Sequence, residues 1–258
     1  MKCSDVIAFL EKLAPPVYAE SWDNTGLLVG DREKEIQKIL VAVDAADRVI
    51  EEACRAGADM LVTHHPLIFT GLKAVNADDF IGRRVRRLIR EDICYYAMHT
   101  NFDIAGDMAG LVVKKLPFKE TKVLDETADG LGLGRIGLLE EPMTVKHLTE
   151  IIKASLEIPN AVLYGDENRI IERVVIMPGS GGSEIGAAVR QGAELMVTGD
   201  IGHHEGIDAL AQGLMILDAG HYGLEKVFVE DMEHKLNEEW KGCIQVVTEQ
   251  IQQPFTVL

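Results

Sequence analysis

The chain has 258 residues, of which 47% are hydrophobic, and a formal net charge of −16. This length is enough for one large domain or two domains of ordinary size, each with its own core, and the composition excludes a disordered chain. The strong negative charge argues against a nucleic-acid partner, because affinity for nucleic acid comes largely from Lys and Arg side chains that neutralise phosphates. The one basic cluster, residues 83–87, is expected to be a solvated helix face.

The apolar runs in the sequence are short. Ile39–Val43 is among the longest, and it is far below the roughly 20 residues that a membrane-spanning helix needs. The N-terminal segment carries Glu11 and Lys12, so it lacks the uninterrupted apolar core of a signal peptide. The four cysteines form no Cys-x-x-Cys motif, which leaves buried, reduced thiols as the simplest interpretation. We therefore expect a cytoplasmic protein without a membrane partner.

Short apolar segments alternate with helical ones in the first part of the chain. The sequence predicts helices at residues 4–13, 47–56 and 80–90. It predicts strands at residues 27–29, 39–43, 60–63 and 93–98. Pro15 and Pro16 end the first helix, and Gly57 ends the second. This alternation is typical of parallel β-α-β units.

The segment from about residue 118 to residue 171 is less regular, and the alternation resumes after it. The predicted strands lie at residues 133–139, 161–164, 174–177, 195–198 and 215–217. The predicted helices lie at residues 145–156 and 184–191. Residues 178–182 (Pro-Gly-Ser-Gly-Gly) are predicted to form a turn before a helix. The backbone N–H groups of this turn could hold a phosphate or a carboxylate, although a tight strand-to-helix connection is the simpler interpretation.

Two stretches of the chain repeat one another. Residues 57–63 (Gly-Ala-Asp-Met-Leu-Val-Thr) match residues 192–198 (Gly-Ala-Glu-Leu-Met-Val-Thr), and each stretch is followed by a histidine pair, His64–His65 or His203–His204. Further on, each half has a predicted strand that ends in a His-x-x-x-acid motif. These motifs run from His99 to Asp103 and from His221 to Glu225. Three matched features in the same order indicate a duplicated α/β unit.

The sequence therefore predicts an α/β fold with two similar domains, residues 1–125 and residues 126–258, and a metal site between them. Open α/β sheets bind their ligands beyond the carboxyl ends of the strands, where the repeated histidines and acids lie. If the strand ends of the two copies face each other, six of these residues converge: His64, His65, His99, Asp103, His221 and Glu225. A lone histidine is more often a core or capping residue, but repetition at matched positions favours a metal site. Imidazole and carboxylate together suit zinc, iron, manganese or nickel.

The adjacent pair His64–His65 limits how a metal site could be built. Neighbouring residues on a regular strand point to opposite faces, so both can serve one cluster only where the strand ends or where two ions are present. Pro66 helps to stop the strand. Two ions about 3.5–4 Å apart would give each histidine its own metal, and Glu225 is long enough to bridge them.

Two further acids, Asp44 and Asp200, follow predicted strands and allow two interpretations. Either residue could accept a hydrogen bond that orients an imidazole, or it could cap the helix that follows. For Asp44 the cap is the favoured interpretation, and for Asp200 neither is favoured.

Six motifs spread over nearly the whole chain resemble those of one family. They lie at residues 22–27, 63–69, 99–103, 134–137, 198–200 and 218–221. In these motifs the chain is similar to the GTP cyclohydrolase 1 type 2 homologues, also called the Ngg-interacting-factor-like family. The resemblance implies a two-domain α/β protein that assembles into a ring-shaped homohexamer and contains a dinuclear metal site.

The resemblance also implies a role for each site residue. One ion would be held by His64 and His221, and the other by His65 and Asp103, with Glu225 as the bridge. Two further side chains would line the site without being regular ligands, namely His99 and His204.

The function predicted from these features is that of a metal-dependent hydrolase with two divalent ions per chain. Its substrate would be a small molecule or nucleotide with a cyclic amide, amidine or phosphoester bond. Because the sequence has no Gly-x-Ser-x-Gly motif and no cysteine near a histidine motif, metal-bound water is the expected nucleophile. His99 or His204 could act as the general acid or base. The alternative is a non-catalytic metal-binding protein that delivers metal, senses it or serves as a scaffold.

Overall fold

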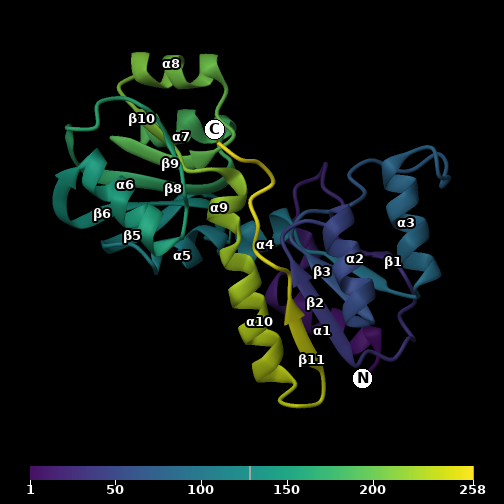
Figure 1. Cartoon of the computed structure of the whole chain (residues 1–258). Helices are drawn as coiled ribbons and strands as arrows, with labels where there is room; N and C mark the ends of the chain where they lie inside the picture. The colour runs from purple at the N-terminus through teal and green to yellow at the C-terminus, as the bar shows by residue number, and fades with distance from the viewer. Residues whose placement is uncertain (128, 258) are drawn as a thin grey trace. The chain divides into compact units, whose positions relative to one another are not determined.

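The structure, a computed structural model, describes residues 1–127 and 129–257 as two compact units, each built around one β-sheet (Figure 1). The mixed α/β class predicted from the sequence is confirmed. The segments that form the two units are Met1–Gly106 with Phe228–Ile251, and Asp107–Val227 with Gln252–Leu258. Within the described residues, no helix is both long enough and apolar enough to span a membrane.

The first unit contains a five-stranded sheet. Its strands follow the order β1 (Gly26–Val29), β4 (Cys94–Ala97), β3 (Met60–Thr63), β2 (Lys38–Ala42) and β11 (Gln245–Thr248). Strands β4, β3, β2 and β11 are parallel, and β1 is antiparallel to β4. Every residue of β3 and β4 is buried, which explains why these strands read as continuous apolar runs in the sequence.

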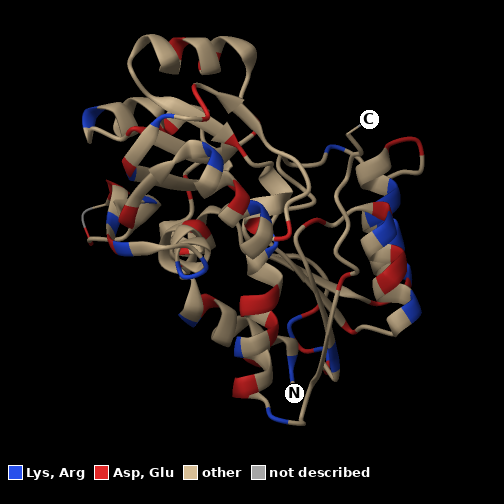
Figure 2. Ribbon diagram, turned by 60° about the vertical axis from the view of Figure 1, so that its left-hand side comes forward, with Lys and Arg blue, Asp and Glu red and all other residues tan. Residues whose placement is uncertain are grey.

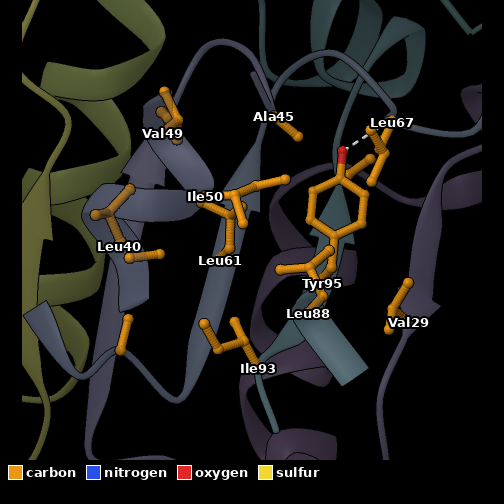
Figure 3. Packing of buried hydrophobic residues seen from close by; sticks show 14 of the residues in the cluster. Val29, Leu40, Ala45, Val49, Ile50, Leu61, Leu67, Leu88, Ile93 and Tyr95 are labelled. Carbon is orange, nitrogen blue, oxygen red and sulfur yellow. Dashed lines mark hydrogen bonds between the residues drawn. The ribbon is translucent and has the colours of Figure 1, made fainter. Parts of the chain in front are cut away.

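The helices of the first unit are α1 (Cys3–Leu13), α2 (Asp47–Ala56), α3 (Phe80–Arg90), α4 (Thr100–Ala105) and most of α10 (Val227–Glu239), with the short 3-10 helix η1 (Pro16–Tyr18). Two of them, α2 and α3, cover one face of the sheet. Helices α2 and α3 pack on the sheet through a cluster that includes Val49, Leu61, Leu88 and Tyr95 (Figure 3). Three of the four arginines in residues 83–87 are exposed, and blue positions run along the ribbon of α3 in Figure 2, in agreement with the predicted solvated face.

The second unit contains a six-stranded sheet. Its strands follow the order β5 (Phe118–Glu126), β6 (Gly132–Thr144), β8 (Ile170–Ser180), β9 (Leu195–Gly199), β10 (Met215–Asp218) and β7 (Val162–Tyr164). Strands β8, β9 and β10 are parallel, and the other neighbours are antiparallel. Its helices are α5 (Met108–Val113), α6 (Val145–Ser155), α7 (Ile185–Arg190), α8 (His203–Ala211) and α9 (His221–Glu225), with the 3-10 helix η2 (Gly182–Glu184).

Both sheets contain the same arrangement of strands. The order β1-β4-β3-β2 in the first unit corresponds to β7-β10-β9-β8 in the second, with one antiparallel edge strand beside three parallel strands. The helices α2 and α7 are each followed by a glycine with positive φ, Gly57 at 63° and Gly192 at 71°. Glycine adopts this left-handed conformation without steric cost, which ends the helix and turns the chain into the next strand. The predicted duplication is therefore visible in the strand order.

The compact units divide the chain differently from the two predicted domains, residues 1–125 and 126–258. Strand β5 pairs with β6 and belongs to the second unit, although nearly all of it precedes residue 126. Strand β11 pairs in parallel with β2 and belongs to the first unit, although it lies near the end of the chain. Strand pairing between distant segments decides the division, and local sequence carries little of that information.

The structure contains elements that were not predicted, namely β5, β11, α4, α5, α8, α9 and α10, and one predicted turn differs. Strand β5 was not predicted, because it lacks the apolar pattern of a strand. Lys119, Glu120 and Lys122 are exposed, and only Leu124 is fully buried. The predicted turn at residues 178–182 is wrong in part, because β8 continues as far as Ser180. The register of β8 against β9 shifts between Ile176 and Ser180, which is the kind of irregularity that a glycine inside a strand often marks.

A buried tyrosine holds the segment that follows β3 in place through hydrogen bonds. The hydroxyl of Tyr95 accepts a hydrogen bond from the backbone N–H of Leu67 (2.8 Å) and donates one to the carbonyl of His65 (2.9 Å), as Figure 3 shows for the first of these. The hydroxyl of Thr63 lies 2.8 Å away. Because Tyr95 is fully buried, water cannot replace these bonds, and the tyrosine fixes where the chain leaves the strand.

We predict that Tyr95→Phe lowers the free energy of unfolding by about 1–3 kcal/mol, since it leaves the buried N–H of Leu67 without an acceptor. Tyr96→Phe is the matched control, because Tyr96 is equally buried and its hydroxyl has no hydrogen-bond partner within the described part of the chain. The control should be neutral or slightly stabilising. Urea denaturation of both variants measures the difference, and equal losses of stability would contradict the role given to Tyr95.

Candidate metal centre

His64 and His65 continue the line of β3 in the first unit. Their backbone N–H groups donate to the carbonyls of Ala42 (3.3 Å) and Val43 (2.9 Å). The ring of His64 is fully buried, and that of His65 is 16% exposed. The two ring centroids lie only 4.9 Å apart, which is possible because the regular strand ends at Thr63. The structure therefore meets the first of the two conditions under which neighbouring histidines can serve one cluster.

A third imidazole joins this pair. His99 follows β4, the neighbour of β3, and its ring centroid lies 5.2 Å from that of His64 and 5.4 Å from that of His65. One ligand nitrogen from each of the three rings lies within 4.8 Å of the others, so this group could hold a metal ion. Asp103, one turn along α4, places Oδ1 3.5 Å from Nε2 of His64, whereas the family resemblance pairs Asp103 with His65.

All three rings are held in the same way. In each ring Nδ1 lies within hydrogen-bond distance of an oxygen that can only accept, either a backbone carbonyl or an ionised carboxylate. Nδ1 therefore carries a proton, so in the neutral imidazole Nε2 has the lone pair, which is how metal-binding histidines are commonly oriented. The pairs are His64 with the Met98 carbonyl (2.8 Å), His65 with Asp44 (2.8 Å) and His99 with Asp23 (2.9 Å).

Asp23 is the functional residue that sequence reasoning missed. Its carboxylate is fully buried and accepts hydrogen bonds from Nδ1 of His99 and from both the backbone N–H and the hydroxyl of Thr100. Burial alone would raise the pKa of Asp23, but the hydrogen bonds from His99 and Thr100 lower it to about 2. The sequence shows Asp23 only as part of the motif at residues 22–27, and no local signal connects it with a histidine that follows 76 residues later.

The second unit carries its own pair of ligands on the short helix α9. His221 and Glu225 are four residues apart, so they share one face of the helix. Nε2 of His221 lies 2.9 Å from Oε2 of Glu225, and Nδ1 of His221 lies 2.7 Å from the carboxylate of Asp200. Glu225 is buried, whereas the side chain of His221 is 29% exposed. The fourth imidazole thus has the same orientation as the other three.

Gly179 explains the unusual end of β8. A Cβ atom at this position would lie 2.6 Å from Oε1 of Glu225 and 3.8 Å from Nε2 of His221. Its φ of +76° is also one that other residues rarely adopt. The glycine therefore lets the backbone of β8 pass close to the ligand pair, which is a different role from the anion-binding turn considered from the sequence.

The structure corrects the interpretation of Asp44. Helix α2 has Ala46 at its N-cap without a side-chain capping bond, so Asp44 does not cap this helix. Instead, Asp44 lies beside His65, as described above. Asp200, for which the sequence left both interpretations open, likewise lies beside His221. In both cases the residue that follows the strand orients an imidazole.

His204, the second residue predicted for acid–base chemistry, lies in the first turn of α8. It is exposed, and its ring contacts that of His203 at a centroid distance of 5.3 Å. Among the described residues, His204 does not belong to a group of ligand atoms within 4.8 Å of one another. Its proposed role therefore depends on the family resemblance alone.

Comparison with other proteins identifies the family and the fold. Residues 1–254 match the Duf34/NIF3 (NGG1p interacting factor 3) family. The chain is 37% identical to the GTP cyclohydrolase 1 type 2 homolog of Clostridium perfringens, over 99% of both chains. Its fold matches that of a Bacillus cereus protein related to NIF3 with a TM-score of 0.94 and 25% identity, covering 100% of this chain and 99% of that one. A hypothetical protein of Staphylococcus aureus matches with a TM-score of 0.92 and 31% identity, with the same coverage.

We predict that Asp44→Ala weakens metal binding by about 10- to 100-fold, because His65 loses the acceptor that fixes its tautomer and orientation. Asp47→Ala is the matched control, since Asp47 lies on the same connection but pairs with Arg84 rather than with a histidine. Titration of the metal-free proteins with zinc in the presence of a competing chelator measures both affinities. Equal affinities for the two variants would show that Asp44 does not support a ligand.

Proposed function

Because this chain belongs to the Duf34/NIF3 family, we propose that it is a metal-dependent hydrolase with two divalent ions per chain. Its substrate is a small molecule or nucleotide with a cyclic amide, amidine or phosphoester bond. The observation that carries the proposal is the common arrangement of four imidazoles, each of which has Nδ1 within hydrogen-bond distance of a backbone carbonyl or a carboxylate. Metal-binding histidines almost always donate their other ring N–H to such an acceptor, so the occurrence of the arrangement four times supports metal binding.

The proposed metal ligands come from both units of the chain. They are His64, His65 and Asp103 in the first unit, and His221 and Glu225 in the second. In the pattern that the family resemblance implies, His64 and His221 would hold one ion, His65 and Asp103 would hold the other, and Glu225 would contact both. Imidazole and carboxylate ligands accept zinc, iron, manganese or nickel, so the ion is set by geometry and availability rather than by ligand type alone.

Some residues of the chain would bind the metal ions, and others would transfer protons. When bound, the ions supply Lewis-acid polarisation of the substrate and lower the pKa of water. His99 is our candidate for the general base, because Asp23 keeps Nδ1 protonated and leaves Nε2 able to accept a proton. The pKa of Asp23, lowered to about 2, keeps this carboxylate ionised at neutral pH, where it stabilises the imidazolium that proton transfer creates. His204 is the second candidate.

We further propose that the protein acts as a ring-shaped homohexamer in the cytoplasm. The assembly rests on the family resemblance, and light scattering would test it by giving the mass of six chains. The location is supported by the cysteines, all four of which are free thiols, as is typical of reducing compartments.

We predict that the purified protein holds about two divalent ions per chain and that the double variant His64→Ala/Asp103→Ala holds far fewer. His234→Ala is the control, because His234 is an exposed histidine that pairs with Glu238 on α10. Elemental analysis gives the metal content, and circular dichroism shows whether each variant is folded. A parent protein that stays metal-free after reconstitution with zinc, manganese and iron would overturn the proposal.

The variant Glu225→Ala decides whether the two sets of ligands share their ions. Because a bridge would contact both ions, its loss is expected to lower the metal content below one ion per chain, although it leaves every ligand of the first unit in place. Retention of about one tightly bound ion would instead indicate separate sites and would contradict the bridging role of Glu225.

We predict that His99→Gln lowers kcat by about 10²- to 10⁴-fold while metal content stays unchanged. The assay is a panel of nucleotides, cyclic amides and phosphoesters with the ion found by elemental analysis, and His147→Gln, an exposed histidine on α6, is the control. Loss of metal from His99→Gln would make His99 a ligand rather than a base. If the metal-loaded parent turns over no member of the panel, the non-catalytic alternative, a metal-binding protein for delivery, sensing or scaffolding, replaces the hydrolase.

A further inference from the structure

Two large aromatic side chains stand beside His99 and have no role in holding it. The ring of Trp22 contacts that of His99 edge to face at a centroid distance of 5.9 Å, and the ring of Phe69 does the same at 5.7 Å. Trp22 is nevertheless 61% exposed and Phe69 51% exposed. Exposed aromatic residues that converge on one site cost solvation free energy, and in proteins such groups commonly mark a ligand-binding site.

The two aromatic residues are held in place by hydrogen bonds of their neighbours. Asp23, next to Trp22, accepts from His99 and Thr100, and Asn24 donates from its side chain to the carbonyl of Ile68 at 2.6 Å. This last bond joins the turn that carries Trp22 to the segment that carries Phe69. The rings are therefore positioned before a ligand arrives, which reduces the entropy that binding would otherwise cost.

A cavity lies beside Phe69 in the first unit. Its volume is about 460 Å³, and its lining is the segment from Leu67 to Ala74, which includes Phe69, together with Asn76, Asp79 and Ile81. This size lies in the range of small-molecule pockets. The walls combine apolar side chains with a few polar ones, as expected for a site that binds a ring with polar groups on its edge.

We propose that Trp22 and Phe69 form a stacking subsite for a planar aromatic ring of the substrate, next to His99; the proposal rests on the proposed hydrolase function. Aromatic side chains bind such rings through dispersion and offset stacking, which a puckered, saturated ring cannot match. The subsite thus selects substrates with a planar heteroaromatic or fully conjugated ring. Aliphatic amides and simple phosphate esters, which lack such a ring, are excluded from good binding.

Tryptophan fluorescence gives a direct test, because the chain has only two tryptophans. Trp22 is exposed, whereas Trp240 is buried against Phe9 and inaccessible to a ligand. Metal-loaded protein is titrated with inosine, with uridine and with 5,6-dihydrouridine, which differs from uridine only in its saturated, non-planar base. We expect saturable quenching by inosine and uridine and roughly 10-fold weaker binding of dihydrouridine.

Substitution then assigns the effect to the two rings. Phe69→Ala should weaken uridine binding roughly 10-fold, and Trp22→Ala, followed by calorimetry, should do the same. Phe80→Ala is the matched control, because Phe80 is also 51% exposed but packs against Arg84, 5.1 Å from its ring. Affinity for uridine should be unchanged in this control, and the metal content should be unchanged in all three variants.

Three outcomes would overturn the proposal. Equal affinity for uridine and dihydrouridine would show that planarity is not recognised, and absence of binding by both inosine and uridine would show that the rings take no such ligand. A change in oligomer mass on Trp22→Ala or Phe69→Ala, with ligand affinity unchanged, would assign the rings to a contact between copies of the chain. Elemental analysis of the same samples distinguishes an error in the stacking subsite from an error in the proposed function. If the proposed function is wrong, the parent protein will contain no metal.

Discussion

The hydrogen bond at Nδ1 of each site histidine is the constraint on which the rest of the structure depends. An imidazole whose Nδ1–H is donated to a carbonyl or a carboxylate has only Nε2 left for other chemistry. A metal ion requires a neutral imidazole with a free lone pair, and this bond selects that tautomer and fixes the plane of the ring. In the described residues the bond occurs once with a backbone carbonyl and three times with a carboxylate. The fold can be understood as the means of placing an acceptor beside each ring.

Parallel strands provide most of these acceptors. Neighbouring parallel strands end at the same edge of a sheet, so the residue that follows one strand lies beside the residue that follows the next. In the first unit this places Asp44, after β2, beside His65, after β3. In the second unit it places Asp200, after β9, beside His221, after β10. Neighbouring parallel strands therefore produce the same kind of carboxylate–imidazole pair in both sheets, although the two pairs lie on strands that are not equivalent in the duplication.

Local sequence was sufficient to predict the elements that are defined by local patterns. Strand β3 and helices α2 and α3 were predicted to the residue, because each is a continuous apolar or amphipathic segment bounded by a turn residue. Strand β5 was not predicted, since its stability comes from pairing with β6 rather than from its own apolar residues. The role of Asp44 was misjudged because a carboxylate between a strand and a helix looks the same whether it caps the helix or orients a distant ring. Asp23 could not be assigned at all, because its partner lies on another strand end.

The network around Asp23 couples parts of the site that the sequence keeps apart. A buried carboxylate is unfavourable unless donors compensate for the lost water, and here three donors from His99 and Thr100 do so, with the result that its pKa falls to about 2. The same bonds anchor the turn that carries Trp22 to the start of α4, so the orientation of the imidazole and the position of the exposed indole depend on one side chain. This arrangement explains why an aromatic residue can remain exposed and yet fixed beside His99. Loss of the Asp23 carboxylate would therefore disturb proton transfer and ring recognition together, whereas loss of either aromatic ring would disturb recognition alone.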